Sequence, residues 1–165
     1  MANEKSTGKV ESVAASPRIV RLQGGGIRFL DAHEISQLDF NVVTRPFQNN
    51  NTQHWRLTNV SGNVHTIQHV SNSRFLDAHE ISSLNFRVVT RKEQNEPGNT
   101  TQHWRFLDFG GGFFAIQQVS SGRFLEATLD LELPAGDPLR FQVVLSNPPS
   151  DQPTNNQQVW RLGDP

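Results

Sequence analysis

Two short segments of the 165-residue chain carry the same chemically capable side chains. Asp31 is followed two positions later by His33, and Asp77 is followed in the same way by His79. In a β-strand each pair would share one face. Such a pair can ligate a metal ion, exchange hydrogen bonds with a polar ligand, or simply hold a turn. The elements that position the two pairs help to separate these roles.

An internal repeat places both pairs in equivalent surroundings. Fifteen of eighteen positions are identical between residues 28–45 and 74–91, including Arg45 and Arg91 at the end of each segment. A third and weaker copy begins at 123–127, carries an insertion of six residues around 129–138, and has lost the Asp, the His and the Arg. Two copies that keep all three side chains favour ligand binding over turn formation, because a residue set needed for folding would also persist in the third copy.

The pattern of substitutions predicts strands. The three mismatches fall at 37/83, 39/85 and 41/87, which alternate with the unchanged Leu38, Phe40 and Val42. Alternation is typical of a strand with one buried face, so we expect these three side chains inside and Asp39, Asn41, Val43 and Arg45 on the outer face. Further strand signals span 64–70 and 114–119, and glycine runs at 24–26 and 110–112 predict hairpin turns.

The three copies imply one closed domain. A single repeat of short strands cannot bury its own apolar face, and open stacking would leave exposed sheet edges. The sequence therefore predicts an all-β barrel of three repeats of about 46–56 residues, at 17–62, 63–111 and 112–165. The polar residues 1–16 are expected to form a flexible tail outside the single domain 17–165.

Metal and catalytic sites lack the residues they need. No third ligand follows either Asp-x-His pair at a recognisable spacing, and the chain has no cysteine and no Gly-x-Ser-x-Gly sequence. Asp31 and Asp77 belong to different repeats, whereas glycoside hydrolysis needs carboxylates about 5–10 Å apart. We expect no enzyme activity, no metal and no cofactor.

Charge and hydropathy exclude other partners. A formal charge of −1 gives no basic face for nucleic acid, and no apolar run is long enough to insert into a membrane. The N-terminus has no apolar signal segment, so we expect a cytoplasmic protein, with unconventional export left open.

Each repeat ends on a Gln-x-Trp triplet, and this spacing resembles the ricin-type β-trefoil lectins. The resemblance covers about nine-tenths of the chain and implies a β-trefoil with pseudo-three-fold symmetry that binds carbohydrate. It also implies that the triplets are structural, with the Trp in the core and the Gln tying loops together. These residues are Gln53, Trp55, Gln102, Trp104, Gln158 and Trp160.

The resemblance also places two sugar sites. In the family an Asp after the first strand accepts hydrogen bonds from sugar hydroxyls, an outward and usually aromatic residue on the next strand stacks on the sugar, and the residue before Gln-x-Trp adds a polar contact. Here arginine stands at the aromatic position, and the histidines are the substitutes we expect for stacking. The predicted carbohydrate-binding residues are Asp31, His33, Asp39, Arg45, Asn51 and Thr52 in repeat one, and Asp77, His79, Asn85, Arg91, Asn99 and Thr101 in repeat two.

We therefore expect a multivalent lectin, or agglutinin, with two working sites and a degenerate third. The resemblance implies glycans or glycoconjugates of the galactose or N-acetylgalactosamine type as partners, whereas Arg45 and Arg91 in place of an aromatic residue would favour an acidic or otherwise unusual glycan. A homodimer is compatible with the sequence. The alternative is a trefoil that binds a protein, such as a protease inhibitor, through an exposed loop at 90–98 or at the proline-rich 145–154.

Overall fold

The computed structural model describes residues 17–24, 26–147 and 156–165. The predicted tail 1–16 and residues 148–155 of the proline-rich loop lie outside the described residues.

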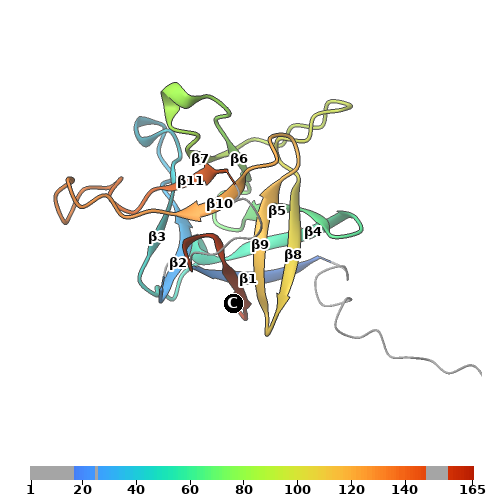
Figure 1. The fold of residues 1–165 in the computed structure, drawn as a ribbon, viewed down its shortest axis with the longest axis horizontal. Coiled ribbons are helices and arrows are strands. Elements are labelled where there is room, and N and C mark those ends of the chain that lie inside the picture. The colour runs from blue at the N-terminus through green and yellow to red at the C-terminus, as the bar shows by residue number, and fades with distance from the viewer. Residues whose placement is uncertain (1–16, 25, 148–155) are drawn as a thin grey trace, which may run out of the picture.

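The described chain is built from short strands and 3-10 turns, with no α-helix (Figure 1). The described residues contain no helix that is long and apolar enough to cross a membrane. The strands are β1 (Arg18–Gly24), β2 (Arg28–Ala32), β3 (Val42–Arg45), β4 (Trp55–Ser61), β5 (Val64–His69), β6 (Phe75–Ala78), β7 (Val88–Arg91), β8 (Trp104–Gly110), β9 (Phe113–Gln118), β10 (Phe124–Ala127), β11 (Val143–Ser146) and β12 (Trp160–Gly163). The 3-10 turns are η1 (Ser36–Leu38), η2 (Asn51–Gln53), η3 (Ser82–Leu84) and η4 (Asn156–Gln158).

Six strands close into a barrel. Going round the ring, β1 pairs with β4, β4 with β5, β5 with β8, β8 with β9, β9 with β12, and β12 again with β1, all antiparallel. The other six form three hairpins, β2–β3, β6–β7 and β10–β11, one from each repeat. A six-stranded barrel with three hairpins is a β-trefoil, which confirms the predicted all-β fold.

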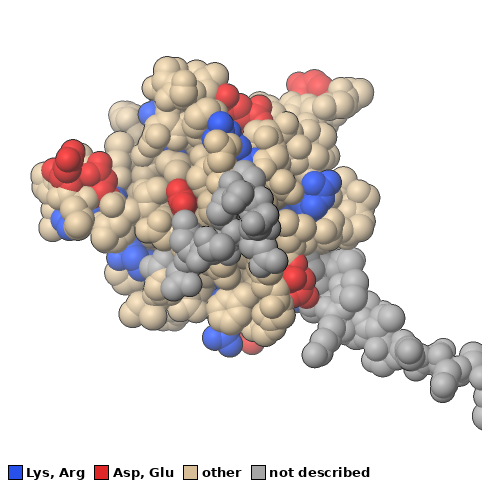
Figure 2. All heavy atoms as spheres, in the orientation of Figure 1, with Lys and Arg blue, Asp and Glu red and all other residues tan. Residues whose placement is uncertain are grey.

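Charged side chains of both signs are dispersed over the face in Figure 2. Lys and Arg alternate there with Asp and Glu across a mostly uncharged surface, with no broad area of one sign. This distribution matches the near-zero net charge of the sequence.

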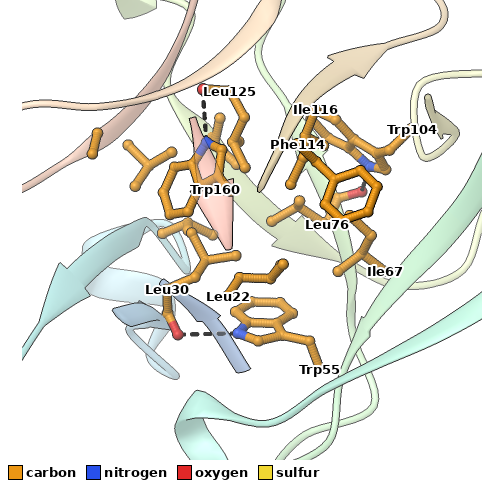
Figure 3. Close-up of a cluster of buried hydrophobic side chains, with 14 of the residues drawn as sticks. Leu22, Leu30, Trp55, Ile67, Leu76, Trp104, Phe114, Ile116, Leu125 and Trp160 are labelled. Atoms are coloured by element: carbon orange, nitrogen blue, oxygen red, sulfur yellow. Dashed lines mark hydrogen bonds between the residues drawn. The ribbon is translucent and has the colours of Figure 1, made fainter. Parts of the chain in front are cut away.

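The core repeats itself three times around the barrel. Trp55, Trp104 and Trp160 are fully buried (Figure 3). Each indole nitrogen donates to a backbone carbonyl at the start of its own repeat, those of Leu30, Leu76 and Leu125, at 3.0 Å in every case. Each Trp therefore ties the last strand of its repeat to the first hairpin of that repeat, and satisfies the indole N–H in a dry environment.

The strand predicted around 38–45 is shorter than expected, and two of the four side chains expected on its outer face are buried. Ser36–Leu38 is a 3-10 turn, Asp39 and Phe40 have left-handed backbones with φ of 51° and 50°, and β3 begins only at Val42. Asn41 and Val43 are buried, contrary to the prediction. The reason is that backbone bridges join Asn41 to Val89 of repeat two and Val43 to Gln142 of repeat three.

Contacts between an arginine and a phenylalanine hold neighbouring hairpins together. Arg28 lies over the ring of Phe141 at 3.4 Å, and the equivalent Arg74 lies over Phe40 at 3.7 Å. The third pair, Arg123 over Phe86, has a separation of 3.8 Å. Each pair joins one repeat to the repeat before it in the ring, with repeat one following repeat three.

Candidate functional site

Asp31 lies at the centre of the predicted site in repeat one and is fully buried. Its Oδ1 accepts from the backbone N–H of Ala32 at 2.7 Å and forms an ion pair with Arg45 at 3.0 Å. Its Oδ2 accepts from Thr52 Oγ1 and Gln53 Nε2, both at 3.2 Å. Both carboxylate oxygens are thus occupied by the protein and neither is open to a ligand, whereas the resemblance implied a direct contact with sugar hydroxyls.

Repeat two builds the same arrangement around Asp77. This carboxylate is also fully buried, with the backbone N–H of Ala78 at 2.7 Å and Arg91 at 3.2 Å. Thr101 Oγ1 and Gln102 Nε2 donate to its second oxygen at 3.3 and 3.0 Å. The sequence identity between the repeats is therefore matched by identity of the hydrogen-bond network.

The arginines connect each buried Asp to its histidine. Arg45 Nη2 lies 3.1 Å from His33 Nδ1, and Arg91 Nη2 lies 3.0 Å from His79 Nδ1. Because a guanidinium only donates, each Nδ1 is the acceptor and the proton of the neutral ring sits on Nε2. The structure thus brings Asp, Arg and His together in both repeats, and leaves the arginine side chains 28 and 30% exposed at the surface.

A loop of repeat three forms a wall of the site in repeat one. His33 Nε2 donates to the backbone carbonyl of Pro138 at 2.8 Å. Pro138 belongs to the inserted segment between β10 and β11, which projects from the body in Figure 1. Between this segment and β3 lies a pocket of about 470 Å³, lined by Arg28, His33, Arg45, Ala135, Asp137 and Phe141 among others.

The corresponding position in repeat two holds a carboxylate. His79 Nε2 donates to Asp39 Oδ2 of repeat one at 2.6 Å, and Arg87 donates to the same oxygen at 2.9 Å. Partial burial raises the pKa of Asp39, but the hydrogen bonds donated by His79 and Arg87 and the positive charge of Arg87 outweigh it, so this pKa lies below its usual range. The two sites therefore share an Asp–Arg–His network and differ in what the histidine faces.

The described residues of repeat three form none of this network. Glu126 is only half-buried, and Ser146 occupies the position of the arginines, opposite Phe124 in the β10–β11 ladder. Gln158 Nε2 donates to Ser146 Oγ at 2.5 Å, and Thr128, at the histidine position, donates to the carbonyl of Gln142. Serine thus replaces the acidic partner of the Gln-x-Trp glutamine.

The remaining predicted residues surround these networks without equal roles. The side-chain oxygen Oδ1 of Asn51 lies 3.2 Å from His54 Nδ1, and Asn51 is exposed, as is Asn85 in the turn after η3. Asn99 accepts from the Thr101 backbone N–H at 3.0 Å. In repeat one the equivalent contact comes from Asn50, at 3.1 Å from the Thr52 nitrogen.

Sequence reasoning missed two contributors. Asn50 could have been found, since it stands two residues before Thr52 as Asn99 stands before Thr101. The wall at 135–138 has no counterpart in the other repeats, and no spacing in the sequence places it against His33. Among the described residues no group of three His, Asp or Glu side chains is arranged to hold a metal.

Solved structures share the fold of this chain. A designed three-fold symmetric protein, ThreeFoil, superposes with a TM-score of 0.70 at 21% identity, covering 89% of this chain and 99% of its own. The Polyporus squamosus lectin, solved with a human-type influenza-binding epitope, superposes at 0.68 with 14% identity; the match covers 89% of this chain and 49% of the lectin. The BEL β-trefoil matches at 0.64 and 17%, covering 93% and 97%.

The profile of the ricin-type beta-trefoil lectin domain-like family matches residues 50–139, more than half of the chain. The chain belongs to this family. No curated protein sequence matches it significantly.

Proposed function

We propose that this protein binds carbohydrate without catalysing a reaction, through the Arg45 and His33 surface of repeat one and the Arg91 and His79 surface of repeat two. The observation that carries the proposal is the Asp–Arg–His network, which is built twice with nearly the same distances and replaced in repeat three. Family membership supports carbohydrate binding as the general activity.

The buried carboxylates act here by positioning the arginines. Asp31 holds one edge of the Arg45 guanidinium and His33 holds another, so the remaining N–H groups and the flat face of Arg45 are presented in a fixed orientation. A guanidinium has five N–H donors, which can bind the hydroxyl oxygens of a sugar. Fixing it beforehand reduces the side-chain entropy lost on binding.

The charge of the network favours a neutral sugar. Each arginine is within 3.2 Å of a buried carboxylate, so the pair carries no net charge and exerts little attraction on an acidic glycan at a distance. We therefore propose galactose- or N-acetylgalactosamine-type glycans as ligands, as the family resemblance implied. Two sites on one rigid barrel would strengthen binding to a glycan-covered surface through multivalency.

The residues found in repeat three suggest substitutions that test the two proposed carbohydrate sites. The variant Asp31→Glu, Arg45→Ser, Asp77→Glu, Arg91→Ser gives repeats one and two the Glu and Ser already tolerated at 126 and 146. Arg56→Ser, on the exposed outer face of β4, is the matched control. All proteins are first shown to be folded at the assay temperature and are then applied to an array of galactose- and N-acetylgalactosamine-terminated glycans.

We expect the native protein and the Arg56 control to bind the same glycans, and the four-residue variant to lose at least ten-fold in affinity. Unchanged binding by that folded variant would remove these residues from the site. A native protein that binds no glycan would refute the proposal and move attention to a protein partner.

A further inference from the structure

Arg21 is a buried charged side chain that has no oppositely charged partner among the described residues. It is 7% exposed, and its Nε is buried with no hydrogen-bond partner. Its Nη1 lies 3.5 Å from the backbone carbonyl of Asp164, and the guanidinium stands 4.8 Å from the ring of Phe47. Asp31 and Asp77, the other buried charged residues among those described, each have an arginine within 3.2 Å. Burying an uncompensated cation is costly, so this position is unusual.

The strand pairing explains why Arg21 borders open space. Val20 and Leu22 point into the barrel core, so Arg21 between them points to the outside. In the β1–β12 ladder it lies opposite Gly163, and both residues line the same hollow. A Cβ built on Gly163 would meet no atom within 4 Å.

This hollow is part of a pocket of about 350 Å³ with mostly basic walls. Arg18, Arg21 and Arg161 line it, together with the single carboxylate residue Asp164, the amide of Gln23 and the ring of Phe29. Basic side chains are visible at the lower edge of the molecule in Figure 2, near the C-terminal end that Figure 1 marks. The positive charge also acts on a neighbour, because burial and then Arg21 lower the pKa of His54.

We propose that this pocket binds the oxyanion group of a small ligand, a carboxylate, sulfate or phosphate, with Arg21 as its central contact. Guanidinium N–H groups bind such oxygens in pairs, and the bonds are strong because both partners are charged. An anion here would supply the charge partner that Arg21 lacks. The pocket shares no lining residue with the pocket beside His33, so it is a separate site that does not depend on the proposed carbohydrate sites.

The first test titrates sodium sulfate at constant ionic strength, with chloride as the balancing anion. Thermal unfolding is followed, together with the NMR signals of the arginine Nε–H groups. We expect saturable stabilisation of the native protein and a saturable shift of the Arg21 signal. At a sulfate concentration of ten times Kd, the unfolding equilibrium constant should fall about 11-fold.

Three variants separate a built site from a general salt effect. Arg21→Met, which keeps the apolar stem, and Gly163→Val, which fills the hollow, should both abolish the saturable response. Arg56→Met on the exposed face of β4 should keep it. If Arg21→Met does not fold, Arg161→Met replaces it, with an expected loss of at least five-fold in affinity.

Equal stabilisation of all variants would overturn the proposal, because sulfate stabilises most proteins by exclusion from their surface. Replacing sulfate by inorganic phosphate or glucuronate identifies which oxyanion binds best. Arg21→Met should still bind the glycans of the native protein, and the four-residue variant in repeats one and two should still respond to sulfate. Failure of one proposal is therefore distinguishable from failure of the other.

Discussion

The ion pair between Arg45 and Asp31 predicts that two similar-looking substitutions differ in cost. Asp31 is fully buried, whereas the Arg45 side chain is 28% exposed. Asp31→Asn leaves a guanidinium that can turn toward water. Arg45→Met leaves a buried charge that cannot. We expect Arg45→Met to be the more destabilising, although arginine is the residue nearer the surface.

The hydrogen bonds of Asp31 allow the free-energy cost of each substitution to be estimated. In Asp31→Asn the amide oxygen still accepts from the Ala32 backbone N–H, whereas the amide nitrogen cannot accept from Thr52 or Gln53. Those two donors keep other acceptors, Asn50 Oδ1 and the Pro46 carbonyl, so the loss is that of hydrogen bonds to a charged acceptor, about 1–2 kcal/mol. In Arg45→Met the carboxylate keeps its bonds from Ala32, Thr52 and Gln53 but loses its counter-ion. Breaking a buried pair from one side costs about 3–5 kcal/mol, and the remaining bonds place our expectation near 3 kcal/mol.

Urea unfolding at equilibrium measures both free energies and their coupling. The double variant Asp31→Asn, Arg45→Met removes both charges, so it should cost about 1–3 kcal/mol less than the sum of the single variants. Arg56→Met serves as the control for loss of an exposed arginine, with an expected change within about 0.5 kcal/mol. Additive effects, or a larger loss in Asp31→Asn, would refute the reasoning that the buried carboxylate depends on its arginine.

Three further predictions concern the fold. Phe141→Ala removes the ring 3.4 Å from Arg28 and should lower the free energy of unfolding by about 1–3 kcal/mol in urea. The lowered pKa of Asp39 means that this group stabilises the fold above the unfolded-state value of about 3.9 and loses that effect as the pH falls further. The native protein should therefore lose more thermal stability than Asp39→Asn between pH 5 and about pH 2.5. Gly24→Ala places a Cβ 2.5 Å from the Trp160 ring and should cost about 1–3 kcal/mol by overpacking, measured in the same urea assay.

Control variants at exposed positions test whether these losses of stability come from the contacts named. Phe109→Ala removes an exposed ring, and Gly136→Ala adds a methyl group in open space, so both should change stability by less than about 0.5 kcal/mol. Equal losses at 109 and 141 would show that the Arg–Phe contact adds nothing to loss of the ring. Parallel pH profiles for the native protein and Asp39→Asn would remove the charge of Asp39 from the acid response.

The sequence predicted the fold because the same signals occur in all three repeats. Each copy carries a Gln-x-Trp triplet after matched strand patterns, and three such copies are compatible with few architectures. The β5 and β9 strands match the predicted 64–70 and 114–119 within a residue or two. The alternation around Leu38 and Phe40 failed because burial at this position comes from neighbouring repeats, and a one-strand pattern contains no information about them.

The residues of the candidate site could be predicted from the sequence, but their contacts could not. Repetition of Asp, His and Arg selected residues that the structure joins by hydrogen bonds. Whether a carboxylate faces ligand or protein depends on the arginine side-chain conformation, which sequence spacing does not determine. The Pro138 wall and the Asp39 partner depend on which repeat precedes which in the closed ring.

Closure of that ring between β1 and β12 also governs how the protein can be synthesised. β1 leaves the ribosome before the other strands of the barrel, yet one of its edges stays unpaired until residues 160–163 have emerged. During elongation β1 can pair with β4, but β9 and β1 both present open edges where β12 will insert. Such edges can pair with other nascent chains. β12 therefore completes the barrel, and the trefoil can close only after residues 160–163 have been synthesised.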